Sequence, residues 1–200
     1  MTGVVIGVLL VLILAALVVV ILLLQRRREV PAASAAPRDP FAASEHTAGD
    51  PRALKAGDMV EYLGTRYFVR GSLRIREGGF TWSEHLLDAD TRDGGKVWIS
   101  VEEDPDLEVV WWTEIDIGDL RPDARHLTVD GVEYRRDEHG TADYTSEGTT
   151  GLGVTGRVEY VDFEGPRGRY LAFEQFGGGT WEAGVGERVP DGSLTIYPGS

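Results

Sequence analysis

Hydrophobic and polar positions divide the chain into three regions, and the first is the plainest. Residues 3–24 contain no charge and no proline. A helix of this segment, rising about 1.5 Å per residue, would reach about 33 Å, which crosses the roughly 30 Å hydrocarbon core of a bilayer. A helix also satisfies its own backbone groups in lipid. The pattern therefore predicts one N-terminal transmembrane helix, with residues 1–28 forming the anchor and its basic flank.

The charges around this segment predict its orientation. Arg26, Arg27 and Arg28 follow it directly, whereas no Lys or Arg precedes it, and basic clusters favour the cytoplasmic side. We expect a single-pass plasma-membrane protein with its N-terminus outside and its C-terminal domain in the cytoplasm. A cleaved signal peptide is the alternative, because residues 33–35 read Ala-Ser-Ala, but the arginines lie between the apolar run and that site. Gly3 and Gly7 have the spacing that lets two membrane helices approach, which suggests a helix-mediated homo-oligomer.

The second region, residues 29–53, is rich in Ala and Pro and has no sustained apolar period, which is typical of an extended linker. In the third region, residues 54–197, short runs rich in β-branched and aromatic residues alternate with glycine-containing turns. Strands are expected at residues 59–63, 67–75, 80–89, 97–102, 107–113, 127–136, 141–145, 157–164, 170–176, 180–183 and 193–197. No segment there has a helical period, so we predict an all-β soluble domain.

The strand-rich region has two similar halves, residues 54–115 and 126–197. Val60-Glu61-Tyr62 recurs as Val132-Glu133-Tyr134, and the segment that begins at Trp98 recurs at Tyr170, both at an offset of 72. Glu84-His85-Leu86 matches Glu159-Tyr160-Val161 at an offset of 75, and Trp111 matches Trp181 at 70. We interpret this pattern as an internal duplication. Two such halves would pack as a sandwich or as paired half-barrels.

Composition limits the kinds of partner. The chain has 200 residues and a formal net charge of −13, and the part after residue 28 contains all 33 acidic and 17 of the 20 basic side chains, a net charge of −16. Such a surface repels nucleic acid and anionic lipid and favours basic proteins, polyamines or metal cations. Solubility alone is the simpler explanation of this charge. The absence of cysteine excludes disulfides, thiolate metal sites and cysteine nucleophiles.

Candidate chemistry is sparse, and no nucleotide, metal or catalytic motif stands in a fitting context, so we expect neither cofactor nor metal. Glu84 and His85 are adjacent, but neighbours on a strand point to opposite faces and cannot share a proton directly. Trp82 and Glu84 should share one face, and Ser83 and His85 the other. If the halves pack symmetrically, glutamates from both could converge on a cation or an amine. The candidate ligand or partner surface comprises Trp82, Glu84, His85, Trp98, Glu102, Trp111, Trp112, Glu159, Tyr160, Glu174 and Trp181.

One set of residues resembles a known family over residues 54–197. The resemblance is carried by Gly57-Asp58-x-Val60-x-Tyr62, Tyr67-x-Val69-x-Gly71, Trp82-x-Glu84-His85-Leu86-Leu87 and Trp98-Ile99. These motifs resemble the bacterial family named domain of unknown function 4178, in which Tyr is more usual at the position of His85. The resemblance implies a β-rich domain with no assigned reaction, often on membrane-anchored proteins. Genes of the family tend to lie near those of small membrane proteins and spermidine synthase-like proteins, which implies an envelope or polyamine-linked role.

Three functions remain open at this point. The first is a non-enzymatic interaction module, fixed at the membrane through residues 3–24, whose acidic and aromatic surface recruits a basic protein. The second is a domain that binds or senses a small ligand, a polyamine or a divalent cation. The third is an enzyme, which is disfavoured because the sequence shows no arrangement of residues typical of a catalytic nucleophile, a metal site or a cofactor site.

Overall fold

The computed structural model describes residues 49–89 and 94–199 of the chain. The predicted transmembrane helix, with Gly3 and Gly7, and most of the predicted linker lie outside these residues. Within the described part, no helix is long and apolar enough to cross a membrane. The last linker residues are described: a short 3-10 helix, η2 (Pro51–Ala53), begins after Asp50, whose side chain accepts a hydrogen bond from the backbone of Arg52.

The described residues form eleven strands, so the all-β prediction is confirmed. In chain order they are β1 (Met59–Tyr62), β2 (Thr65–Glu77), β3 (Phe80–Leu87), β4 (Val97–Glu103), β5 (Leu107–Ile115), β6 (His126–Val129), β7 (Val132–Gly148), β8 (Thr155–Gly165), β9 (Arg169–Phe176), β10 (Trp181–Arg188) and β11 (Leu194–Tyr197). The segment expected to hold strands at 127–136 and 141–145 is instead a short β6 followed by a continuous 17-residue β7.

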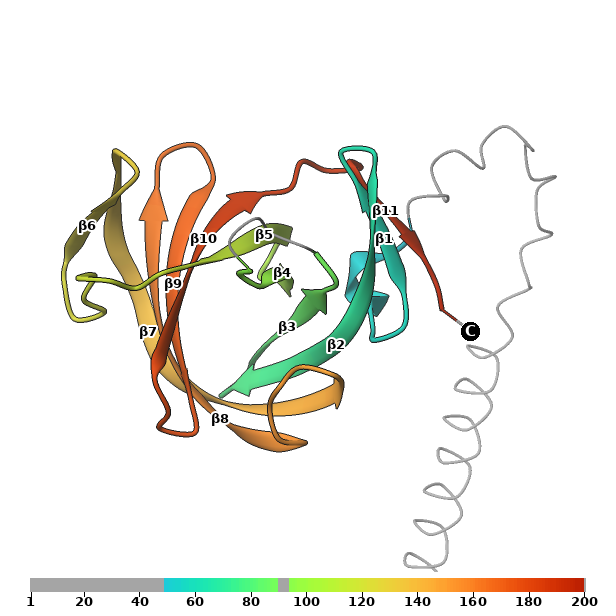
Figure 1. Ribbon diagram of the computed structural model, residues 1–200, viewed down its shortest axis with the longest axis horizontal. Helices are drawn as coiled ribbons and strands as arrows, with labels where there is room; N and C mark the ends of the chain where they lie inside the picture. Colours follow the sequence, from blue (N-terminus) through green and yellow to red (C-terminus); the bar gives the residue numbers. More distant parts are fainter. Residues whose placement is uncertain (1–48, 90–93, 200) are drawn as a thin grey trace, which may run out of the picture. The chain divides into compact units, whose positions relative to one another are not determined.

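The strands close into a barrel (Figure 1). The sheet order is β11-β1-β2-β3-β4-β5-β10-β9-β8-β7-β6, and a further pairing joins β2 to β7. That pairing closes an eight-stranded antiparallel ring made of β2, β3, β4, β5, β10, β9, β8 and β7. Figure 1 shows β6 at one side of the ring and β1 with β11 at the other. A closed ring has no free sheet edge, which is one way in which β proteins avoid uncontrolled strand pairing.

The two halves expected from the sequence each contribute four strands to this one closed barrel, so of the two expected arrangements, a sandwich or paired half-barrels, the sandwich is wrong. The first half supplies β2 to β5 and the second half supplies β7 to β10. The halves meet twice, where β5 pairs with β10 and where β2 pairs with β7. Both of these contacts join strands far apart in the sequence. In each half a two-residue turn with positive φ precedes the first barrel strand, at Leu63-Gly64 and at Asp130-Gly131.

Some of the repeated sequence segments lie on corresponding strands of the two halves and others do not, so the duplication itself stays a prediction. Trp98 and Tyr170 lie on β4 and β9, and Trp111 and Trp181 lie on β5 and β10, which are corresponding strands of the two halves. The Val-Glu-Tyr repeats lie on β1 and at the start of β7, which do not correspond.

Apolar residues pack in three clusters, one inside the ring and two outside it. The inner cluster, with Leu73, Ile75, Tyr144 and Val158, fills part of the barrel interior. The first outer cluster covers strands of the first half beneath β1 and β11 and comprises Leu54, Val60, Val69, Leu87, Val97, Ile99, Val101, Val109, Val189, Leu194 and Ile196. The second covers β8 to β10 beneath β6 and the connector after β5, around Phe163, Leu171 and Phe173. The barrel wall is therefore buried on both faces over much of its area.

Candidate functional site

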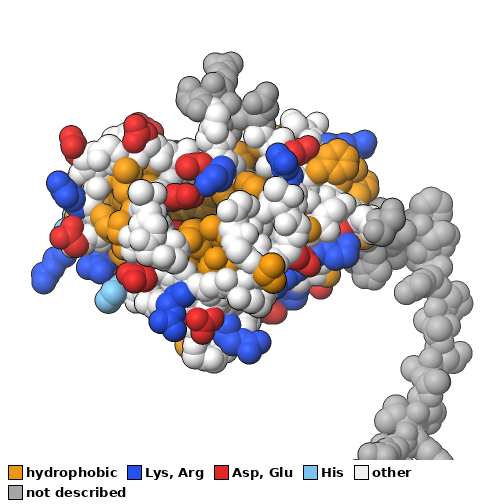
Figure 2. All heavy atoms as spheres, turned by 60° about the horizontal axis from the view of Figure 1, so that its bottom comes forward, with side chains coloured by type: hydrophobic (Ala, Val, Ile, Leu, Met, Phe, Trp, Pro, Cys, Tyr) orange, Lys and Arg blue, Asp and Glu red, His pale blue; other side chains and the backbone are white. Residues whose placement is uncertain are grey.

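A cavity of about 410 Å³ occupies the part of the barrel interior that the inner apolar cluster leaves open. An eight-stranded barrel is wide enough either to be filled by side chains or to hold one small ligand. Because side chains on a strand alternate between faces, β3, β4, β5 and β9 contribute lining residues that stand two apart along each strand. Figure 2 shows a hollow on one face of the molecule, with hydrophobic side chains inside it and acidic side chains at its edge.

The cavity lining is strongly acidic. Among the residues that the structure describes, no Lys, Arg or His lines it. The carboxylate side chains of the lining are Glu77, Glu84, Glu102, Asp104, Glu108, Glu114, Asp137, Glu138, Asp162, Glu174 and Glu182. Burying carboxylates together without counter-charges is unfavourable, because each loses hydration and repels the others.

Three of these carboxylates are paired with cations that stand outside the cavity. Lys96 Nζ lies 2.8 Å from Glu182 and 4.0 Å from Glu114. Arg188 lies 3.6 Å from Glu108, which also accepts a 2.8 Å hydrogen bond from the hydroxyl of Tyr170. These groups are compensated within the protein, so the unbalanced charge belongs to the other carboxylates.

Glu84 on β3 and Glu174 on β9 meet across the barrel and are hydrogen-bonded to each other. Two carboxyl groups can do this only if one of them is protonated. Loss of hydration, and then the charge of Glu84, raise the pKa of Glu174 well above its ordinary value. Trp82 Nε1 donates a 3.1 Å hydrogen bond to Glu84, which favours the charged form of that group. Loss of hydration raises the pKa of Glu84 as well, so the pair favours a state that holds at least one proton.

Among the described residues, Asp162 on β8 and Glu102 on β4 have no neighbouring group that shares a proton with them or donates a hydrogen bond to them. Neither carboxyl group has a hydrogen bond or ion pair with any other residue in the described part of the chain. Loss of hydration, with the charge of Glu84 next in size, raises the pKa of Asp162 to about 8. Glu102 is exposed, and partial loss of hydration with the charge of Glu138 raises its pKa. These are carboxylates that a bound cation would stabilise.

Aromatic rings form much of the remaining wall. Trp82 packs edge-on against Tyr160, with ring centroids 5.6 Å apart. The Tyr160 hydroxyl donates to Glu77, and Glu138 accepts from it at 3.4 Å. Trp112 donates a 2.8 Å hydrogen bond to Ser100, and Trp98 also lines the cavity. Such rings attract cations to their faces, most strongly where water is excluded.

One wall of the cavity is formed by residues with little or no side chain. Gly184 on β10 pairs directly with Ala172 on β9, and both line the cavity. Gly186, two residues further along β10, lies so close to Trp112 that an added Cβ would stand 2.7 Å from its ring. The cavity is therefore open beside Ala172 and Gly184 because these residues have little or no side chain to fill it.

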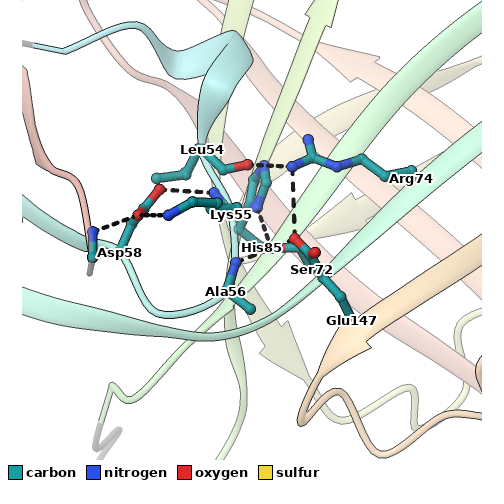
Figure 3. Close-up of polar contacts among 9 residues, drawn as sticks. Leu54, Lys55, Ala56, Asp58, Ser72, Arg74, His85 and Glu147 are labelled. Carbon is teal, nitrogen blue, oxygen red and sulfur yellow. Dashed lines mark hydrogen bonds and ion pairs between the residues drawn. The ribbon is translucent and has the colours of Figure 1, made fainter.

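His85 lies on the other face of β3 and does not take part in this site. It is fully buried, as is Ser72. Ser72 Oγ lies 2.8 Å from His85 Nδ1 (Figure 3). Ser83 Oγ lies 3.1 Å from His85 Nε2. Loss of hydration, and then the charge of Arg74, lower the pKa of His85 to about 3. The imidazole is neutral and satisfied by two serines, and it is separated from Glu84 by the strand itself, as the sequence predicted.

The surroundings of His85 attach the start of the domain to the barrel. Arg74 donates a 2.5 Å hydrogen bond to the carbonyl of Leu54, and Lys55 pairs with buried Asp58 at 2.7 Å (Figure 3). Asp58 also accepts a 2.7 Å hydrogen bond from the backbone of Gly199, close to the end of the chain. These contacts form a structural polar layer rather than an open site.

The structure brings together most, but not all, of the residues singled out from the sequence. Seven of them line the cavity: Trp82, Glu84, Trp98, Glu102, Trp112, Tyr160 and Glu174. Four do not: His85 lies in the polar layer, Trp111 and Trp181 pack against the two outer clusters, and Glu159 is exposed on the outside of β8. Glu159 therefore does not converge with the other glutamates, and for this residue the simpler expectation of a lone glutamate on a solvent face holds.

Several cavity residues were not anticipated, notably Asp162, Glu138 and Tyr170. One signal for Asp162 is present in the sequence. Tyr160-x-Asp162 repeats the aromatic-x-acid spacing of Trp82-x-Glu84, which places both residues on one face of a strand. The match at an offset of 75 instead set Glu84 against Glu159, and an odd shift moves every side chain to the opposite face.

Within residues 49–89 and 94–199, no group of three or more His, Cys, Asp or Glu side chains is arranged so that it could hold a metal ion. The fold and the site together define a class of protein: a closed antiparallel β-barrel domain with an acidic, aromatic interior cavity.

The chain belongs to the family described as Domain of unknown function (DUF4178), which matches residues 55–191. It is 40% identical over 178 residues to an uncharacterized protein of Mycobacterium bovis, and equally to two of Mycobacterium tuberculosis, covering 84% of this chain and 83% of each relative. No solved structure matches it. The family resemblance found in the sequence is thus confirmed, and the membrane anchor stays a prediction.

Proposed function

We propose that this domain binds a small organic cation, an amine in its ammonium form, inside the barrel and performs no reaction on it. The observation that carries the proposal is the unbalanced charge of the cavity. Glu84 and Glu174 share one proton, and Asp162 and Glu102 have no partner among the described residues. Several carboxylates without a counter-charge around one cavity repel each other, so a bound cation would relieve this repulsion as well as gain contacts.

The aromatic lining supports an organic cation in particular. Trp82, Trp98 and Trp112, with Tyr160, offer ring faces and edges against which methylene groups pack and toward which an ammonium is attracted. The cavity volume of about 410 Å³ lies within the range of small-molecule sites. A divalent cation is the alternative ligand, and direct competition with Mg²⁺ would identify it.

The test is titration of the purified full-length chain with butylamine and with diaminobutane, followed by calorimetry and by tryptophan fluorescence. The key variant is the double substitution Glu84→Gln and Glu174→Gln, because a single change at Glu174 only replaces the shared proton and leaves one charge. The matched control is Glu159→Gln, on the outer face of the same strand as Asp162. Saturable binding that is lost in the double variant and kept in the control supports the proposal. Binding that survives in the double variant contradicts the proposal. Failure of both amines to bind the unmodified protein contradicts it as well.

The location of the domain is part of the proposal. The apolar segment 3–24 and the arginines that follow it support an anchor with the domain on the cytoplasmic face. A reporter that is active only in the cytoplasm, fused to the C-terminus, tests this orientation, and silence of the reporter would contradict it. Recruitment of a basic protein by the acidic outer surface stays a prediction, which cross-linking in intact cells would test.

A further inference from the structure

The unpaired carboxylates of the cavity lie at two levels along the barrel. Ser100 on β4 lies directly opposite Glu84, and Glu102 is two residues further along that strand. Tyr160 on β8 lies directly opposite Glu174, and Asp162 is two residues further. At about 3.3 Å per residue, each step is about 7 Å along the strand.

These two steps lead in the same direction. Four antiparallel pairings separate β4 from β8 around the ring, by way of β5, β10 and β9, so the two strands run parallel to each other. Glu84 and Glu174 are in contact and define the lower level. Glu102 and Asp162 consequently both lie toward the same mouth of the barrel and define the upper level.

An apolar wall connects the levels. Trp82 lies opposite Glu102 in the sheet, and Tyr160 lies opposite Glu174, so one ring belongs to each level. Their centroids are 5.6 Å apart, which makes a continuous aromatic surface from one pair of carboxylates to the other. A flexible methylene chain packs well on such a surface, whereas a compact ion would contact one level only.

From this arrangement we infer that the ligand is a linear diamine, with one ammonium between Glu84 and Glu174 and the other between Glu102 and Asp162. The inference rests on the proposed function and specifies its substrate class. Four or five methylene groups separate terminal nitrogens by roughly 6 to 7.5 Å in an extended chain, which matches the step between the levels. A monoamine would leave one level without a counter-charge.

A chain-length series tests the spacing. The full-length protein is titrated with diaminoethane, diaminobutane, diaminopentane, diaminooctane and butylamine under one buffer condition. Affinity is expected to peak at diaminobutane or diaminopentane, at least about tenfold above butylamine, because a second charge-assisted hydrogen bond contributes that much. Equal affinity for butylamine and diaminobutane, or affinity that rises steadily with length, would overturn the inference while leaving the proposed function intact.

The variants separate the levels. Asp162→Asn removes a carboxyl group from the upper level and, above pH 8 where Asp162 is ionised, is expected to weaken diaminobutane binding about tenfold or more while changing butylamine binding less than about threefold. The double substitution at Glu84 and Glu174 is expected to abolish binding of both amines, and Glu159→Gln to change neither. Circular dichroism confirms that each variant is folded. A diamine preference that survives Asp162→Asn contradicts the two-level arrangement, and failure of both amines to bind the unmodified protein removes the proposed function as well.

Discussion

The two faces of strand β3 bury polar groups in opposite ways. On the outer face, His85 is fully buried and both ring nitrogens have a serine partner. On the inner face, Glu84 shares a proton with Glu174, beside carboxylates that have no described partner. A satisfied buried group stabilises the fold, whereas an unsatisfied one marks a place where something else can bind. The comparison supports a structural role for the outer face and is the basis of the recognition role proposed for the inner face.

The largest expected effect lies on the outer face. His85→Ala would leave Ser72 and Ser83 without their partner and create a void, and it should lower the free energy of unfolding by about 4 kcal/mol. Urea denaturation measures the loss. Affinity of the remaining folded protein for amines should be unchanged, since the ring does not reach the cavity. A loss below about 1 kcal/mol would contradict the structural role of this histidine.

Neutralising Glu84 and Glu174 should have the opposite effect on stability. Glu84→Gln with Glu174→Gln removes a buried charge, so the ligand-free protein is expected to become more stable by about 2 kcal/mol although binding is lost. Glu174→Gln alone should change stability far less, because it mimics the protonated member of the pair. Thermal unfolding of the single and double variants, side by side, measures the difference. If the double variant were less stable than the parent, repulsion among the cavity carboxylates would not be destabilising the ligand-free protein.

The two faces should also respond oppositely to pH. Asp162 binds its proton more tightly when folded, with a pKa of about 8 against 3.8, so it contributes stability at low pH that is lost as pH rises toward 8. His85, at about 3 against 6.5, binds its proton less tightly when folded, so it contributes stability that is lost as pH falls below 6.5. Only the carboxyl groups act between pH 6.5 and 8.

In that window the stability of the ligand-free protein should therefore fall with pH, by at most about 1.4 kcal/mol per unit from Asp162. Denaturation curves at pH 6.5, 7.25 and 8 measure the slope. Asp162→Asn should flatten it, and diaminobutane should bind more tightly as the carboxyl group ionises. Asp58, Glu61 and Glu103, whose pKa values are lowered, act only below their ordinary values and leave this window unaffected. An Asp162→Asn variant with the parental slope would show that another group titrates.

The smallest effect is expected at Glu159. Its side chain is exposed on the outside of β8, one residue from Tyr160, so Glu159→Gln should change the free energy of unfolding by less than about 0.5 kcal/mol and leave amine affinity unchanged. Calorimetric titration checks both points in one preparation. A marked loss of affinity would move the site to the outer surface of the barrel.

The faces of individual strands could be predicted from the sequence, because alternation is local. Trp82 and Glu84 were correctly separated from Ser83 and His85. Barrel closure could not be predicted, since it depends on the pairing of β2 with β7 and of β5 with β10, which are far apart in the chain. Glu159 was misplaced through a three-residue error in aligning the halves, and the same error concealed Asp162, because an odd shift exchanges the two faces of a strand. Residues within one strand were thus placed more reliably than relations between strands.

The side-chain-poor wall at Ala172 and Gly184 separates two properties of the cavity. In the proposed site, the carboxylates determine the charge of the ligand, and this wall limits the size of the ligand. A Cβ added at Gly184 would meet its neighbours at 3.5 Å or more, an ordinary contact distance, so larger residues can enter there without disturbing the backbone. A larger residue at Ala172 or Gly184 is therefore expected to change the size of amine that the proposed site accepts while every acidic group stays in place.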